Sequence, residues 1–126
     1  MANAADEIAN GITAQWAAAY AKLDADALSS LYSKHALFYG SNPTLYRGRD
    51  GVKAYFSGLP RWTAQSVEFT DVVTEAVGAD IVSMAGTANF VFDKDTLTVK
   101  ITWVIVREDG GWKILSHHVS SKARLL

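Results

Sequence analysis

The fold is decided by the sequence LTVKITWVIVREDGGWKILSHHVSS at residues 97–121. Its two apolar runs flank the turn EDGG, a pattern typical of two antiparallel strands, which we expect at residues 97–107 and 112–122. Between Ile101 and Val106 the first of these strands is apolar at both odd and even positions. Because successive side chains of a strand point to opposite faces, this strand should be covered on both faces of its sheet.

Two further strands are predicted before this pair. Val67, Phe69, Val73 and Val77 share one parity and are separated mostly by polar residues, which predicts a strand from Gln65 with one side facing the core. Turns at residues 78–80 and 93–95 then enclose a strand at residues 81–92. Connections this short allow only antiparallel pairing, so we expect a meander of four long strands.

The beginning of the chain is predicted to be helical. Asn3 can cap a first helix that carries apolar residues at helical spacing and runs to about Leu23. Asp24 can cap a short second helix, which we expect to include Leu31 and Tyr32. The two helices should therefore follow each other directly.

The remaining elements complete an α+β architecture. Residues 36–39 and 45–46 are expected to form a small hairpin, and residues 52–59 repeat apolar side chains every three to four positions as a third helix. The length of 126 residues and the lack of any linker or repeat predict one domain over residues 1–126. Three helices cover one face of the sheet, and the other face lacks a cover. We therefore expect a homodimer through the sheet.

The composition excludes several functions. Lys and Arg number 12 and Asp and Glu 13, so a net charge of -1 provides no positive field for nucleic acid or an anionic membrane. The absence of Cys excludes disulfides and thiolate metal ligands. Asp6 and Glu7 stand where a secretory signal needs basic residues, and no apolar run reaches about eighteen residues. We expect a soluble cytoplasmic protein without nucleic-acid or membrane partners.

Adjacent histidines, His117 and His118, lie on the last predicted strand, so only one of them can face a given side of the sheet. His117 shares its parity with Leu115 and Val119, and an imidazole that faces a pocket could act as a general acid or base. The alternative is that both histidines are hydrogen-bonded structural residues. His35 has no carboxylate at zinc-ligand spacing, so no metal site is predicted.

Aromatic residues form the larger candidate site. Ligand pockets commonly have apolar and aromatic walls with a few polar groups, and several aromatic side chains should converge on the interior of this domain. Trp103 could equally fill that interior, in which case the aromatic residues form a packed core without free volume. The predicted pocket residues are Trp16, Tyr20, Tyr39, Tyr55, Trp62, Asn89 and Trp103.

Three segments carry a resemblance to a known superfamily. LYSKHALFYG at residues 31–40, LYRGRDGVKAYF at residues 45–56 and GGWKILSHHVSS at residues 110–121 resemble nuclear transport factor 2-like proteins, especially the SnoaL-like and SgcJ/EcaC-type small proteins. The association domain of calmodulin-dependent kinase II is similar too. The resemblance implies a cystatin-like conical barrel, with three N-terminal helices on a strongly curved, mainly antiparallel sheet. It also implies a cone-shaped pocket, a His117 side chain that faces inward, and a homodimer through the outer face.

The same resemblance argues against one activity of that superfamily. Ketosteroid isomerases use an aspartate base after the first strand, a tyrosine on the first helix and a protonated aspartate on the third long strand. In this sequence these positions fall near Tyr39 or Gly40, near Trp16 and near Trp103. Without the carboxylates, proton transfer by that mechanism is not expected.

The sequence thus predicts a small-molecule-binding SnoaL-like protein with an unnamed substrate, a small hydrophobic or aromatic molecule. Whether it is an enzyme stays open. A cofactor-free isomerase, cyclase or dehydratase would use His117 as its catalytic residue, with Tyr20 or Tyr39 as hydrogen-bond donors. The alternative is a non-catalytic association module similar to the kinase oligomerisation domain, in which the sheet builds an assembly.

Overall fold

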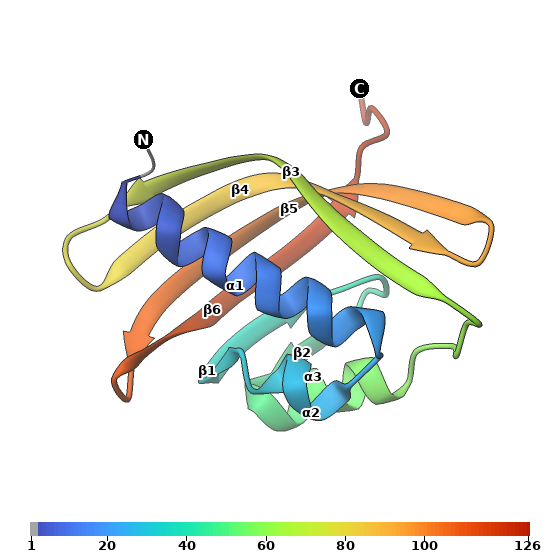
Figure 1. Cartoon of the computed structure of the whole chain (residues 1–126), viewed down its shortest axis with the longest axis horizontal. Coiled ribbons are helices and arrows are strands. Elements are labelled where there is room, and N and C mark those ends of the chain that lie inside the picture. The colour runs from blue at the N-terminus through green and yellow to red at the C-terminus, as the bar shows by residue number, and fades with distance from the viewer. Residues whose placement is uncertain (1–2) are drawn as a thin grey trace.

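The computed structural model describes residues 3–126 as an α+β fold in which helices pack on one curved, six-stranded sheet (Figure 1). The strand order is β2-β1-β6-β5-β4-β3, and within residues 3–126 the edge strands β2 and β3 do not pair, so the sheet is open and the barrel is not closed. The predicted fold class is confirmed with that difference. The elements are α1 (Ala4–Ala21), α2 (Ala25–Ser29), β1 (Tyr32–Tyr39), β2 (Leu45–Arg47), α3 (Gly48–Ser57), β3 (Gln65–Ala76), β4 (Ile81–Phe92), β5 (Asp95–Glu108) and β6 (Gly111–Ser121).

The strands β3 to β6 form the predicted antiparallel meander. β1 then pairs in parallel with β6, which places Phe38 beside His117 and Tyr39 beside His118. A parallel pair needs a long crossover, and here everything from β2 to β5 lies between the two strands in the chain. This pairing brings the N-terminal half of the chain against the last strand.

The predicted second helix is wrong at its end. α2 stops at Ser29, and the Ile114 backbone N–H donates a hydrogen bond of 2.9 Å to the Leu31 carbonyl. Strand pairing therefore replaces helical hydrogen bonding directly after α2, and β1 begins at Tyr32 instead of at Ala36. The Tyr32 side chain is fully buried, so the energy of packing against the sheet outweighs the local helical pattern.

A bulge in β3 changes which side chains face the core. The register with β4 shifts just before Val73, and Asp71 has a φ of 54°. One extra residue in a strand reverses the parity beyond it. Val67 and Phe69 therefore pack against the core as predicted, whereas the prediction for Val73 and Val77 is wrong, because these side chains are 68% and 53% exposed.

α1 begins at the predicted cap, where the Asn3 side chain accepts a hydrogen bond of 2.9 Å from the Asp6 amide. The helix lies across the inner face of the sheet against β3 and β4, and α3 packs against β1 (Figure 1). Trp16, on the buried side of α1, is only 2% exposed. Among residues 3–126, no helix combines the length and the apolar character needed to cross a membrane.

The outer face of the sheet is open to solvent in the single chain. On β5 the outward-facing Thr98, Lys100 and Thr102 are exposed, and Val104 and Val106 are half-buried. The prediction that this strand is covered on both faces therefore holds for the inner face alone.

Candidate ligand-binding site

A cavity of about 440 Å³ opens on the inner side of the sheet, with walls from α1, α3, β1, β4, β5 and β6. Four predicted aromatic residues line it: Trp16 and Tyr20 from α1, Tyr55 from α3, and Trp62 from the loop that follows α3. His117 lines it from β6. The interior is therefore not filled by its aromatic side chains. The other lining residues are Phe38, Gly40, Ser41, Phe56, Leu59, Pro60, Phe90, Phe92, Leu97, Val99, Val119, Ser120 and Ser121.

Tyr39 and Asn89, two of the predicted pocket residues, lie on the outer face of the sheet. Tyr39 is 41% exposed and packs beside the ring of His118. The Asn89 amide donates to Thr70 Oγ1 at 3.0 Å and accepts a hydrogen bond from Thr98 Oγ1 at 3.0 Å. Parity along a strand shows which residues share a face but does not show which face meets the helices, and this explains both errors.

Trp103 is the third predicted pocket residue that does not line the cavity, although it lies on the inner face of the sheet. Its side chain is 1% exposed and packs within the core against Trp16 and Phe69. It therefore neither fills the cavity nor touches the space available to a ligand. Its indole instead contacts His117, which is itself part of the cavity wall.

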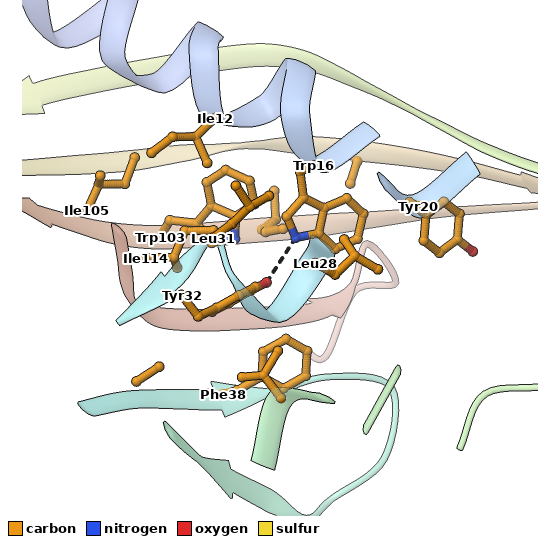
Figure 2. Packing of buried hydrophobic residues seen from close by; sticks show 14 of the residues in the cluster. Ile12, Trp16, Tyr20, Leu28, Leu31, Tyr32, Phe38, Trp103, Ile105 and Ile114 are labelled. Atoms are coloured by element: carbon orange, nitrogen blue, oxygen red, sulfur yellow. Dashed lines mark hydrogen bonds between the residues drawn. The ribbon is translucent and has the colours of Figure 1, made fainter. Parts of the chain in front are cut away.

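His117 lies in a network of buried polar side chains and is itself 4% exposed. Its Nδ1 is 2.8 Å from Tyr32 Oη and 2.9 Å from Trp103 Nε1. The Tyr32 hydroxyl also accepts a hydrogen bond of 2.9 Å from Trp16 Nε1–H, shown as the dashed line in Figure 2. We refer to Trp16, Tyr32, Trp103 and His117 as the buried tetrad. It joins α1, β1, β5 and β6.

The face of the His117 ring is held by stacking. Phe38 lies parallel to it, with ring centroids 4.0 Å apart and an angle of 23° between the planes. The parallel register of β1 and β6 sets these two residues side by side. Along β1, buried Ala36 and Phe38 alternate with exposed Leu37 and Tyr39, so the strand turns Phe38 inward. The imidazole is therefore fixed both in its plane and in its direction.

Burial lowers the pKa of His117 to about 3, and the neighbouring His118 adds to the effect. A histidine with this pKa is uncharged at neutral pH. Burial also raises the pKa of Tyr32 far above its usual value, so the tyrosine hydroxyl keeps its proton. At neutral pH the buried tetrad therefore carries no formal charge.

Tyr20 brings a second polar group to the cavity. Its ring stacks on Trp16 with centroids 5.4 Å apart, and burial followed by the influence of Tyr55 raises its pKa to about 12. Among residues 3–126, Gln65 Oε1 is the one side-chain nitrogen or oxygen that is sealed from solvent and has no hydrogen-bond partner. Tyr20 Oη and His117 Nε2 also have no hydrogen-bond partner among residues 3–126, but neither is sealed from solvent. Because both residues line the cavity, these two atoms face its open volume.

Two contacts that each join a loop to a helix or strand border the cavity. Trp62 stacks on Phe92 with centroids 4.9 Å apart, which ties the loop after α3 to the hairpin between β4 and β5. The Tyr55 hydroxyl donates to Ser41 Oγ at 2.7 Å and accepts from the Ser41 amide at 2.9 Å. The sequence analysis missed Phe38 and Phe92 as wall residues, although the alternation of apolar residues in their strands was a usable signal.

The cavity wall contains no Asp, Glu, Lys or Arg side chain in the described part of the chain. Nor do residues 3–126 gather three or more His, Cys, Asp or Glu side chains that could hold a metal ion. The groups that can act on a bound molecule are therefore aromatic surfaces, hydroxyls and one uncharged imidazole. Such a wall suits a ligand without formal charge, because a buried charge without a partner is costly.

This fold agrees with the comparisons with known proteins. The chain belongs to the SnoaL-like domain family, whose model matches residues 9–124. That range contains the whole buried tetrad and every residue of the cavity wall. No curated protein matches the chain.

Three solved structures are similar along nearly the whole chain. A Xanthomonas campestris protein assigned as a calcium/calmodulin dependent protein kinase II association domain has a TM-score of 0.85 and 19% identity, covering 98% of this chain and 91% of its own. A hexachlorocyclohexane dehydrochlorinase, LinA type 2, has a TM-score of 0.80 and 17% identity, covering 93% of this chain and 84% of its own. A Streptomyces avermitilis protein assigned as a dehydratase of the NTF2-like family has a TM-score of 0.80 and 20% identity, covering 95% of this chain and 97% of its own. At these identities the similarity shows the fold alone.

Proposed function

We propose that the protein binds a flat, apolar, uncharged small molecule in the cavity. The observation that carries the proposal is a volume of about 440 Å³ whose wall is mainly aromatic and contains no charged side chain. Pockets of this size and character are typical of small-molecule sites. Aromatic rings such as those of Trp16, Tyr20 and Phe90 favour flat partners, because stacked and edge-on contacts add to the burial of apolar surface.

The chemistry we propose for such a ligand is isomerisation, cyclisation or dehydration without a cofactor. Support comes from membership of the SnoaL-like family and from the fold shared with a dehydratase and a dehydrochlorinase. Within the cavity, His117 and Tyr20 present polar atoms that a substrate could meet. Tyr39 drops out of this proposal because it lies on the outer face.

A variant that fills the cavity tests the binding proposal. Val119 lines the cavity from β6 and is half-buried. In Val119→Phe the phenyl ring is larger than the valine side chain and should occupy part of the free volume. We expect the affinity for fluorene, measured by quenching of tryptophan fluorescence, to fall about tenfold, which corresponds to ~1.4 kcal/mol. Thr96→Phe places the same ring on exposed β5 outside the cavity and should leave the affinity unchanged. Equal affinity in all three proteins contradicts binding in this cavity.

We also propose that two chains associate through the outer face of the sheet. This face exposes part of Tyr39, Val73, Ile81 and Val91, and nothing in residues 3–126 covers it. Native mass spectrometry of freshly purified protein should show twice the chain mass of 13.7 kDa, together with any retained small molecule. A large ring without an adduct favours the association module instead, the reading that the similar Xanthomonas campestris structure suggests.

A further inference from the structure

We propose that His117 meets the ligand as a hydrogen-bond donor through Nε2–H, and that the ligand therefore carries a carbonyl oxygen as its acceptor. This inference rests on the proposed binding function and specifies the chemistry of the molecule bound. It also assigns Trp103, Tyr32 and Trp16 as positioning residues, because they act on the ligand only through the imidazole. General base catalysis by His117, an expectation from the sequence, is replaced by this donor role.

The hydrogen-bond directions in the buried tetrad are fixed by the chemistry of its groups. An indole nitrogen can donate a hydrogen bond but cannot accept one. Trp103 Nε1, 2.9 Å from His117 Nδ1, must therefore donate to that nitrogen. Trp16 Nε1 must likewise donate to Tyr32 Oη. The Tyr32 hydroxyl proton is then free to point at His117 Nδ1, which lies 2.8 Å away.

Two donors thus converge on His117 Nδ1. A proton on that nitrogen would face the Trp103 N–H head-on, so Nδ1 must be the bare acceptor of the ring. The imidazole is uncharged, and its single proton is therefore on Nε2. Because Nε2 has no partner in residues 3–126 and reaches the cavity, it offers an N–H to whatever the cavity holds.

The other groups around the imidazole do not disturb this arrangement. Phe38 covers the ring face from β1, Tyr32 approaches from the same strand, and Trp103 approaches from β5. The neighbouring residue on β6, His118, points to the outer face and is exposed. No carboxylate, ammonium or guanidinium group is among these contacts.

The donor at Nε2 selects one class of ligand. The N–H at Nε2 needs an acceptor atom on the ligand. A carbonyl oxygen accepts an N–H well and, unlike a hydroxyl, brings no hydrogen of its own that needs a partner in the cavity. A carboxylate would accept it too, but the cavity wall contains no cation to balance its charge. Together these points favour a ketone, aldehyde or ester on a flat apolar frame. A hydrogen bond from Nε2–H draws electron density toward the oxygen, which stabilises negative charge that develops there during a reaction.

A pair of matched probes tests this assignment. 9-Fluorenone and fluorene share a flat tricyclic frame and differ in a carbonyl group replacing a methylene. We expect the wild-type protein to bind 9-fluorenone about three- to tenfold more tightly than fluorene, the effect of one hydrogen bond. In His117→Asn the side-chain oxygen can replace Nδ1 as acceptor for Trp103 and Tyr32, but no N–H extends to the position of Nε2. This variant should bind the two probes with equal affinity, whatever its affinity for fluorene.

The outcomes separate this inference from the proposed function. If the wild-type protein binds both probes equally, the donor role is wrong although the cavity still binds flat molecules. If it binds neither, both proposals fail. A preference for 9-fluorenone that persists in His117→Asn assigns the donor to another group, such as Tyr20, and overturns the role of His117.

Nitrogen NMR of the histidine rings gives a test without any ligand. Two-bond nitrogen–proton correlations should show His117 as the Nε2–H tautomer, with Nδ1 bare, and this pattern should not change between pH 5 and pH 8. In the double variant Tyr32→Phe with Trp103→Phe both donors to Nδ1 are lost, so a population with the proton on Nδ1 should appear. That variant should also show a smaller preference for 9-fluorenone than the wild-type protein. An Nδ1–H tautomer in the wild-type protein contradicts the inference directly.

Discussion

Replacing Trp16 by alanine is expected to lower the free energy of unfolding by about 4 kcal/mol, within the range for removing a buried aromatic ring. The Trp16 side chain is 2% exposed and packs against a group of aromatic rings, so its loss leaves a large void in the core. It also removes the donor to the Tyr32 hydroxyl, which is then left with an unpaired acceptor in a buried site. Urea denaturation followed by circular dichroism measures the change.

Trp16→Phe is the matched control for this prediction. It keeps a ring against Tyr20 and Phe56 but removes the indole N–H, so we expect a loss of about 1 to 2 kcal/mol. If Trp16→Ala costs no more than this control, the helix α1 does not depend on the aromatic cluster shown here. Core substitutions that conserve volume usually cost less than about 1.5 kcal/mol of stability. If Trp16→Ala costs less than this, the result contradicts the packing of the core.

Acid is expected to destabilise the fold through His117. Its pKa lies near 3 in the folded chain and near 6.5 when unfolded, so between these values the unfolded chain binds more protons. The stabilisation due to the neutral imidazole is fully present above pH 6.5 and is lost progressively as the pH falls toward 3. From pH 6.5 to about pH 4.5 we expect a loss of about 2 kcal/mol in the free energy of unfolding, from one group with this shift.

The variant His117→Asn isolates that contribution, because asparagine does not titrate. Its free energy of unfolding should fall by about 2 kcal/mol less than that of the wild-type protein over the same pH interval. Urea titrations of both proteins at a series of pH values give the comparison. Parallel pH profiles for the two proteins show that His117 takes up its proton in the folded state with little cost, which contradicts the sealed, neutral site.

The sequence predicts those parts of the fold that depend on local pattern and short turns. The meander of β3 to β6 follows from apolar alternation and from turns too short for any parallel return. The start of β1 at Tyr32 could not be predicted, because the segment has a helical apolar spacing and becomes a strand only through its pairing with β6. The bulge at Asp71 is equally hidden, since one inserted residue reverses the parity of Val73 without altering the local composition.

The candidate site was predictable to a similar extent. Helical spacing placed Trp16 and Tyr20 on the inward side of α1, and strand parity placed His117 and His118 on opposite faces of β6. The buried tetrad could not be predicted, because Tyr32 meets His117 only through the parallel register of β1 and β6. That contact joins residues far apart in the sequence, and no spacing rule reports it.

The most direct test of the central claim, an uncharged cavity with His117 as hydrogen-bond donor, is a crystal structure of the protein with 9-fluorenone. We predict the tricyclic frame between the aromatic walls of the cavity, with the carbonyl oxygen about 2.9 Å from His117 Nε2. The Trp103 and Tyr32 contacts to Nδ1 should remain in place. A fluorenone bound outside the cavity, or bound inside it with the oxygen turned away from His117, contradicts the account.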